Sequence, residues 1–320
     1  MKTVILDGWN VSRDDLSWEA PFRLDELVCH ARTAPADVVP RIADAEAVLV
    51  SKCRMSRAVL DACPKLRYIG VFATGYNHVD IDAARDRGIA VTNVPAYSTA
   101  PVSQFVFALL LECVNAVGRH ADAVRTGEWA RSADFCFTLT PQTELAGLRM
   151  GIVGYGSIGR QVARIAQALG MEVLAHTPHP PGVDEAGMPG IRFVPLDELL
   201  HTADVITLHC PLTEQTRHII RAETLVQMKD GVILLNTARG SLVCEADLAP
   251  ALRSGKVAAA GLDVLEQEPP AADNPLTSLP NCIITPHIAW IAKSARERLI
   301  EATFRNLEAF MQGERLNRVD

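Results

Sequence analysis

Three glycines, Gly154, Gly156 and Gly159, have the spacing G-x-G-x-x-G that is typical of a dinucleotide-binding turn. An apolar run of strand type, Arg149–Val153, precedes them, and apolar residues at helical spacing follow as far as Leu169. In such a unit one glycine makes a tight turn, one lets the backbone approach phosphates and one packs the helix against the strand. The pyrophosphate lies at the helix N-terminus, where backbone N–H groups are unpaired. We therefore predict a bound dinucleotide here, rather than a doubly wound domain that binds none.

Three polar segments further along the chain each follow directly on a predicted strand. They are NTARG (Asn236–Gly240), EQEPP (Glu266–Pro270) and TPHIAW (Thr285–Trp290). Ligands in open α/β sheets bind beyond the carboxyl ends of the strands, so we expect all three segments to face the cofactor. The segments contain an arginine, two glutamates and a histidine, which are side chains that bind carboxylates and transfer protons.

Several motifs follow one another in a fixed order over nearly the whole chain. They are ATGYNHVD (residues 73–80), the glycine turn, HCPLT (209–213), NTARG, GLDV (261–264), the glutamate before a proline pair, and PHIAW (286–290). In this order they resemble the motifs of the D-isomer-specific 2-hydroxyacid dehydrogenases. The segments DFCF (134–137) and HIAW are most similar to the glycerate dehydrogenase/hydroxypyruvate reductase group of that family.

The resemblance implies a catalytic trio of Arg239, Glu268 and His287. A guanidinium donates two parallel hydrogen bonds to a carboxylate, so Arg239 would bind the acid group of a 2-oxo acid. His287 would donate a proton to the carbonyl oxygen during reduction and accept it in the reverse direction. Glu268 would accept a hydrogen bond from the other ring nitrogen of His287, which orients the ring and favours its charged form. The alternative for Arg239 is a surface ion pair, and a glutamate before two prolines is on its own only a loop residue.

The resemblance also assigns residues to the two ligands. The substrate would contact Ala73, Thr74 and Gly75, together with Arg239, His287 and Trp290. Trp290 is equally well explained as an interdomain packing residue. The residues expected to bind the cofactor are Thr99, Gly154, Gly156, Ser157, Ile158, Gly159, His176, Thr177, Cys210, Pro211, Thr237, Ala238 and Asp263. No metal ion is expected.

The position that usually selects NAD departs from the common pattern. An acidic residue about 20 positions past the glycines normally binds the ribose hydroxyls, whereas this chain has His176-Thr177-Pro178-His179. No carboxylate there would repel a 2′-phosphate, and no adjacent lysine or arginine would bind one. The sequence therefore predicts NAD or NADP as cofactor, without a preference.

Together these residues predict an oxidoreductase that transfers a hydride between a nicotinamide cofactor and a small D-2-hydroxy acid or 2-oxo acid. The most similar group within the family indicates hydroxypyruvate or glyoxylate as substrate. The alternative is a non-catalytic NAD(H)-sensing regulator, as the C-terminal-binding corepressors of this fold illustrate. Those regulators retain the trio, so the trio alone does not separate the two functions.

Alternating strand and helix patterns must position these residues. Short apolar runs predict buried strands at Val4–Leu6, Ala47–Val50, Tyr68–Phe72, Ile89–Val91, Arg149–Val153, Met171–Ala175, Val205–Leu208, Val232–Leu235, Ala258–Leu262 and Cys282–Thr285. Helical patterns lie at Pro35–Ala43, Ser56–Ala62, Ile81–Arg87, Pro101–Val117, Glu223–Met228, Glu245–Ser254 and Lys293–Gln312, and after the glycine turn. Repeated alternation gives parallel sheets covered on both faces. The predicted fold class is α/β, with two doubly wound parallel-sheet domains, one flavodoxin-like and one of Rossmann type.

Two chain crossings are expected between these domains. Residues 1–100 and 289–320 would form the substrate-binding (catalytic) domain, and residues 101–288 the NAD(P)-binding Rossmann domain. The helix Pro101–Val117 would lead into the second domain, and the terminal helix would return to the first. Two lobes joined in this way imply a cleft between them. Since the 105–117 segment is apolar on nearly every face, we also expect a homodimer through the Pro101–Val117 region.

Composition limits the partners. The 320-residue chain is 48% hydrophobic with a net charge of −7 and has no run of lysines and arginines, so no nucleic-acid partner is expected. The N-terminus lacks a signal-peptide pattern, and the helix Pro101–Val117 is short and interrupted by polar residues, so no membrane partner is expected. The eight cysteines form no C-x-x-C pair, which argues against zinc and for a reduced, cytoplasmic protein.

Overall fold

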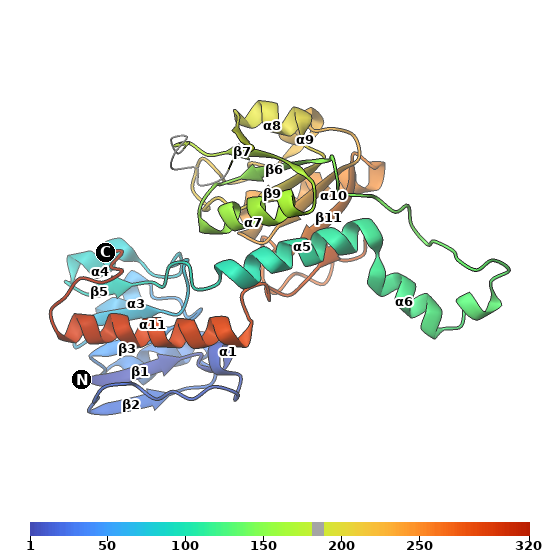
Figure 1. The fold of residues 1–320 in the computed structure, drawn as a ribbon. Helices are drawn as coiled ribbons and strands as arrows, with labels where there is room; N and C mark the ends of the chain where they lie inside the picture. Colours follow the sequence, from blue (N-terminus) through green and yellow to red (C-terminus); the bar gives the residue numbers. More distant parts are fainter. Residues whose placement is uncertain (181–188) are drawn as a thin grey trace. The chain divides into compact units, whose positions relative to one another are not determined.

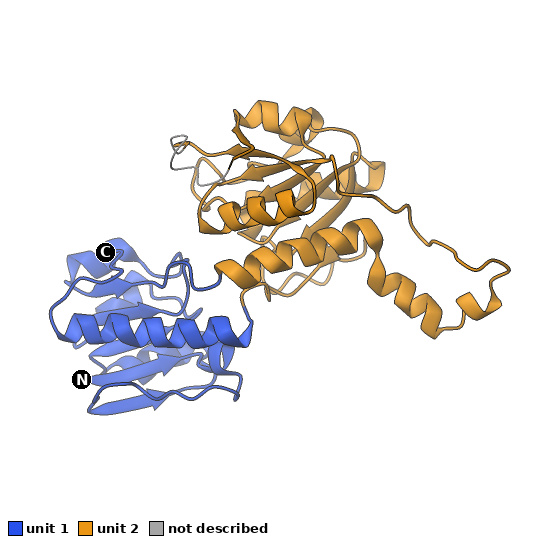
Figure 2. Cartoon of the chain, viewed as in Figure 1, with its two compact units in different colours: residues 1–98, 291–320 blue, residues 99–290 orange. Residues whose placement is uncertain are grey.

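The chain divides into two compact units in the computed structural model, which describes residues 1–180 and 189–320. Unit 1 comprises residues 1–98 and 291–320, and unit 2 comprises residues 99–290 (Figures 1 and 2). The expected crossings at residues 100 and 289 differ slightly from these bounds. Thr99 already begins the first long helix of unit 2. Ala289 and Trp290 also stay with unit 2, because both donate hydrogen bonds to residues of that unit.

Unit 1 is built on a five-stranded parallel sheet with the order β2-β1-β3-β4-β5. This is the flavodoxin-like doubly wound order, in which the chain starts in the middle and winds outwards in both directions. Its strands are β1 (Lys2–Leu6), β2 (Glu26–Cys29), β3 (Ala47–Val50), β4 (Tyr68–Val71) and β5 (Ala90–Thr92).

Helices cover this sheet. They are α1 (Trp9–Ser12), α2 (Val38–Ile42, after the 3-10 turn η1, Pro35–Asp37), α3 (Arg57–Asp61), α4 (Ile81–Asp86) and α11 (Lys293–Met311). The apolar faces of α2, α3 and α4 share one hydrophobic cluster with β1, β3, β4 and β5. The terminal helix α11 packs against β4 and β5 and buries Leu299, Phe304 and Leu307. The terminal helix therefore lies on the sheet of unit 1.

Unit 2 contains a seven-stranded parallel sheet with the order β12-β11-β10-β9-β6-β7-β8. Counted from β6, this is the Rossmann order with one further strand at the edge, and the strand order reverses between β6 and β9. The strands are β6 (Arg149–Val153), β7 (Glu172–His176), β8 (Ile191–Phe193), β9 (Val205–Leu208), β10 (Val232–Asn236), β11 (Val257–Leu262) and β12 (Cys282–Ile284).

The helices of unit 2 lie on both faces of this sheet (Figure 1). One hydrophobic cluster joins the sheet to α5 (Thr99–Asn115) and α7 (Ser157–Ala168). A second joins it to α8 (Leu196–Thr202), α9 (Ala222–Gln227) and α10 (Glu245–Ser254). The remaining helical segments are α6 (Val117–Arg125), η2 (Trp129–Arg131) and η3 (Gly240–Leu242).

The helix expected at Pro101–Val117 is interrupted. Helix α5 ends at Asn115, because Ala116 has a left-handed backbone conformation with φ 45°, and α6 begins at Val117. Among the described residues no single helix is long and apolar enough to cross a membrane. The pair α5 and α6 reaches that length and composition together, but it is bent by 58°.

A buried arginine fixes the start of α11 in unit 1. Arg296 is 5% exposed and donates hydrogen bonds to the carbonyl oxygens of Val11 and Ser12. Its guanidinium also binds both carboxylate oxygens of Asp15, at 2.6 and 2.7 Å. The hydrogen bonds from Arg296 hold the pKa of Asp15 below its usual value.

This shift predicts a pH dependence of stability. The Asp15 contribution is complete above the unfolded pKa of about 3.9 and is lost as pH falls through the lower, folded value. We expect Asp15→Asn to be less stable than wild type at neutral pH, with a difference that shrinks as the pH approaches about 3. Urea-unfolding midpoints at a series of pH values measure this. The neighbouring, exposed Asp14→Asn is the control, and a difference that is constant with pH would contradict the prediction.

Candidate active site

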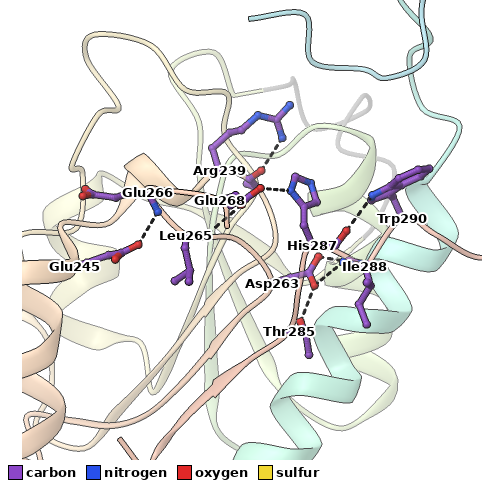
Figure 3. A network of polar contacts seen from close by, with 12 residues as sticks. Arg239, Glu245, Asp263, Leu265, Glu266, Glu268, Thr285, His287, Ile288 and Trp290 are labelled. Atoms are coloured by element: carbon purple, nitrogen blue, oxygen red, sulfur yellow. Dashed lines mark hydrogen bonds and ion pairs between the residues drawn. The ribbon is translucent and has the colours of Figure 1, made fainter. Parts of the chain in front are cut away.

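The three polar segments predicted from the sequence lie together in unit 2. They follow β10, β11 and β12, which are neighbours in the sheet and parallel, so their carboxyl ends meet at one edge. Arg239 follows β10, Glu268 lies in the loop after β11, and His287 follows β12. In Figure 3 the ring of His287 faces Glu268, and Arg239 stands on the neighbouring loop.

His287 and Glu268 form a close pair. Nδ1 of His287 lies 2.7 Å from Oε2 of Glu268, and the other carboxylate oxygen accepts the backbone N–H of Leu265 at 3.1 Å. The two side chains are 26% and 36% exposed, so solvent screens the pair only in part. The second ring nitrogen of His287, Nε2, has no hydrogen-bond partner among residues 1–180 and 189–320. The pair is therefore arranged to present one ring nitrogen to a ligand while Glu268 holds the other.

Asp263 holds the turn that carries His287, which has a left-handed backbone with φ 55°. Its Oδ1 accepts the hydroxyl of Thr285 at 2.6 Å and the backbone N–H of Ile288 at 2.9 Å, and its Oδ2 accepts the N–H of Ala289 at 2.8 Å. Burial raises the pKa of Asp263 despite these donors. Asp263 was expected to line the nicotinamide side of the site. In this structure both of its carboxylate oxygens bind the chain's own groups.

The turn that carries Arg239 is held in a similar way by Asn236. This residue, 1% exposed, accepts the backbone N–H of Ala238 at 3.0 Å and donates to the carbonyl oxygen of Arg239 at 2.8 Å. Nη1 of Arg239 donates to the Ala238 carbonyl at 2.6 Å. Sequence reasoning gave Asn236 no role. The available signal was its place as the polar residue that ends the apolar run VILLN.

Gly240 joins the first loop to the second. A Cβ atom at this position would lie 1.9 Å from both the carbonyl carbon and the oxygen of Leu265, and 2.4 Å from the nitrogen of Glu266. The backbone beside Arg239 therefore touches the backbone of the loop that carries Glu268. This contact was not predicted, since a glycine after NTAR is also compatible with an ordinary turn.

The glycine turn has the geometry that a dinucleotide requires. Gly154 has φ 101°, which favours glycine, and its Cβ would lie 2.5 Å from the backbone nitrogen of Cys210. A Cβ on Gly159 would lie 2.2 Å from the Gly154 carbonyl oxygen, so this glycine lets α7 pack against the turn. A Cβ on Gly156 would meet no protein atom within 4 Å. The backbone at Gly156 thus borders open space at the N-terminus of α7, where phosphates bind.

The other residues expected to bind the cofactor lie mostly at the carboxyl ends of the same sheet. Ser157 and Ile158 begin α7, His176 and Thr177 lie at the end of β7, Cys210 and Pro211 follow β9, Thr237 and Ala238 follow β10, and Thr99 begins α5. Within the described parts of the chain, the buried hydroxyl of Thr237 has no hydrogen-bond partner. A buried polar atom without a partner fits a position that a ligand completes.

Beside these residues, His209 is buried against Thr207, with Nε2 2.9 Å from its hydroxyl, and burial lowers the pKa of His209 to about 3. The ring of His209 is therefore uncharged at neutral pH.

The expected substrate loop belongs to unit 1. Ala73, Thr74 and Gly75 follow β4, and the loop is fixed by a hydrogen bond from the Thr74 hydroxyl to the Val94 carbonyl at 2.8 Å. The backbone N–H groups of Thr74 and Gly75 have no acceptor within the portion of the chain that is described. Trp290 lies in unit 2, where its Nε1 donates to the carbonyl oxygen of His287 at 3.0 Å.

Comparison with known proteins supports one family. Residues 107–289 match the family described as D-isomer specific 2-hydroxyacid dehydrogenase, NAD binding domain. The chain is 48% identical to a hydroxypyruvate reductase from Blautia hydrogenotrophica, with 100% of both chains covered. It is 39% identical to a glycerate dehydrogenase from Methylorubrum extorquens, covering 100% of this chain and 99% of that one. A solved glyoxylate reductase from Paecilomyes thermophila has a TM-score of 0.86 and 31% identity over 99% and 98% of the two chains.

These similarities confirm the predicted family, the α/β fold with its Rossmann-type domain and the prediction of a nicotinamide-dependent enzyme. They lend no support to the alternative of a non-catalytic regulator. The chain belongs to the D-isomer-specific 2-hydroxyacid dehydrogenases and is an oxidoreductase that acts on 2-hydroxy and 2-oxo acids.

Proposed function

We propose that this enzyme reduces small polar 2-oxo acids, hydroxypyruvate and glyoxylate first, with Arg239, Glu268 and His287 as its catalytic residues. The observation that carries the proposal is the 2.7 Å contact between Nδ1 of His287 and Oε2 of Glu268. Both residues and Arg239 lie on loops that follow neighbouring strands of one sheet, and the same sheet carries the glycine turn. The relatives named hydroxypyruvate reductase and glycerate dehydrogenase, both matched over the full chain, support the substrate class.

Arg239 binds the substrate carboxylate. Its turn is fixed by Asn236, and its guanidinium donates one hydrogen bond, to the Ala238 carbonyl, within the described residues. Paired N–H groups of a guanidinium match the two oxygens of a carboxylate, so binding also orients the adjacent carbonyl group. In unit 1, the backbone N–H groups of Thr74 and Gly75 are donors suited to a carboxylate.

His287 donates the proton. The nicotinamide, when bound, supplies the hydride that reduces the carbonyl carbon. The carbonyl oxygen then gains negative charge and requires a proton, which Nε2 of the charged His287 ring donates. Glu268 accepts the hydrogen bond of Nδ1, which fixes the orientation of the ring and stabilises its charged form. In the reverse direction the neutral ring accepts the proton from the hydroxyl group.

The cofactor binds over the glycine turn, at the N-terminus of α7. Gly154, Gly156, Ser157, Ile158 and Gly159 hold its phosphates, with Thr99 near them, while Thr237, Ala238 and Asp263 line the nicotinamide side. The carboxyl ends of β7 and β9 supply the other contacts, from His176, Thr177, Cys210 and Pro211. With no carboxylate at His176 to repel a 2′-phosphate and no adjacent cation to bind one, we expect only modest discrimination between NADH and NADPH.

A homodimer and a cytoplasmic location belong to the same proposal. Most of the apolar surface of α5 packs within unit 2, but Leu111 is 40% exposed. The segment after α5 exposes further apolar side chains, including Phe135 at 89%. A second copy would cover such a surface. The eight cysteines are free thiols, as expected in a reducing compartment.

The experiment that tests the proposal is a panel of 2-oxo acids, assayed with NADH and with NADPH. We expect hydroxypyruvate and glyoxylate to be reduced faster than phosphorylated or branched acids. In Arg239→Lys the charge remains but the paired donors are lost, which costs about 1.5–3 kcal/mol, or roughly 10- to 150-fold in kcat/KM. Cofactor affinity should not change. Faster reduction of a branched acid would contradict the substrate class, and an unchanged kcat/KM in Arg239→Lys would remove that residue from the mechanism.

The role of Glu268 predicts opposite pH profiles for the two directions. Reduction needs the charged ring of His287 as proton donor, so its rate falls as pH rises, whereas oxidation needs the neutral ring and speeds up. Glu268→Gln removes the charge that favours the protonated ring. We expect the reductive limb to move to lower pH, because the neutral amide no longer stabilises the charged ring.

Profiles of kcat/KM from about pH 5 to 9 measure this shift. His209 does not contribute to the limb, because its pKa is about 3. If the wild-type and Glu268→Gln profiles superimpose, Glu268 has no part in proton transfer.

The contact at Gly240 predicts that a side chain at this position lowers kcat by displacing the two loops. In Gly240→Ala the new Cβ meets the backbone of Leu265 and must push the two loops apart. A displacement of about 1 Å at a reacting group costs roughly 100-fold in rate, so we expect kcat to fall by that order. Gly156→Ala is the matched control, because its Cβ meets open space. The control should raise the KM for the cofactor and preserve the trio. Equal kcat for Gly240→Ala and wild type would show that this contact does not position the trio.

A further inference from the structure

The loop that carries Glu268 has little apolar packing of its own. Every residue from Glu266 to Asp273 is exposed to solvent, and the buried apolar side chains on either side are those of Leu265 and Leu276. Glu268 therefore stands on a stretch of chain whose shape depends on polar contacts. Its own carboxylate supplies one of them, to the backbone N–H of Leu265.

Glu245 connects both ends of this loop. It lies in the first turn of α10, a helix that is fixed in the core through Leu248, Ala249 and Leu252. One carboxylate oxygen of Glu245 accepts the backbone N–H of Glu266 at 2.5 Å, and the other accepts Nδ2 of Asn274 at 2.6 Å. Figure 3 shows the first of these contacts to the left of the His287–Glu268 pair.

We propose that Glu245 is a positioning residue for the proton-transfer pair, because it holds both ends of the exposed loop and so sets the place of Glu268 against His287. The link is short. The N–H that Glu245 binds belongs to Glu266, and the next residue back, Leu265, donates its N–H to Glu268. This inference rests on the proposed function, in which Glu268 acts on His287.

A second polar contact, from His218, holds only one end of the loop. His218 lies with Nε2 2.5 Å from Oε1 of Glu266, so it binds a side chain at one end of the loop only. Glu245 binds the backbone at that end and Asn274 at the other. The Asn274 side chain is itself fixed, since its Oδ1 accepts the backbone N–H of Leu276 at 2.9 Å. The contacts of Glu245 therefore join the two ends of the loop.

The test compares Glu245→Gln with Asp273→Asn. Glutamine has nearly the same volume but a single acceptor oxygen, so it can keep one of the two hydrogen bonds and must lose the other. We expect kcat for reduction to fall about 10-fold, with the KM for cofactor unchanged, and the reductive limb of the pH profile to move down as in Glu268→Gln. Asp273→Asn also removes one negative charge, but from the exposed loop itself, and leaves both contacts of Glu245 in place. It should behave as wild type.

A double-mutant cycle shows whether Glu245 acts through Glu268. In a Glu268→Gln background, Glu245→Gln should cost less than about twofold, because the pair it positions is already broken. A full, independent loss in both backgrounds would overturn the inference. So would a wild-type pH profile in Glu245→Gln together with a shifted profile in Glu268→Gln. If Glu268→Gln itself has no effect on the profile, the proposed function fails, and that result is distinct from the other two.

A second variant tests the proposal if Glu245→Gln does not fold stably. Asn274→Asp keeps the oxygen that Leu276 requires but places a carboxylate opposite Glu245. If Glu245→Gln is unstable in thermal unfolding, Asn274→Asp should show the same shifted limb in a folded protein. A folded Asn274→Asp with a wild-type limb would contradict the proposal.

Discussion

The close contact between Gly240 and the backbone of Leu265 is the constraint on which the site depends. Neighbouring parallel strands place the ends of β10 and β11 about 4.8 Å apart, but loops with side chains between them would diverge beyond the sheet. Because residue 240 has no Cβ, the two loops stay in contact after they leave their strands. The separation of Arg239 and Glu268 is thus set by two backbones, which move far less than flexible side chains do.

Three polar residues extend this backbone control to the rest of the site. Asn236 holds the turn of Arg239, Asp263 holds the turn of His287, and Glu245 closes the loop of Glu268. Each residue uses both polar atoms of its side chain. Most of these hydrogen bonds join the side chain to a backbone group, and the exceptions are those to the Asn274 side chain and to the Thr285 hydroxyl. These three residues hold the loops in place, and the proposed function gives them no part in proton transfer. Burial raises the pKa of Asp263, which shows that holding the His287 turn has an electrostatic cost that the fold accommodates.

The sequence predicts the central strands well, but it misses two edge strands and the residues that hold the loops of the site. Strand β3 is buried at every residue and has a clear apolar pattern, whereas the edge strands β2 and β8 have only exposed and half-buried positions and were not predicted. The break at Ala116 has no proline or glycine to mark it. Asn236 and Glu245 were missed for another reason: their roles come from partners distant in the fold, and neither residue type specifies a partner by itself.

The glycine turn and the three loops of the site all belong to the sheet of unit 2, which holds them at fixed positions. The glycine turn follows β6, and the loops that carry His287, Glu268 and Arg239 follow β12, β11 and β10 of the same sheet. A parallel sheet covered by helices on both faces is rigid, since its strands share backbone hydrogen bonds and two packed cores. The glycine turn and His287 therefore keep a fixed relation within unit 2. In the proposed function, the sheet of unit 2 thus sets the position of the cofactor relative to the group that donates the proton.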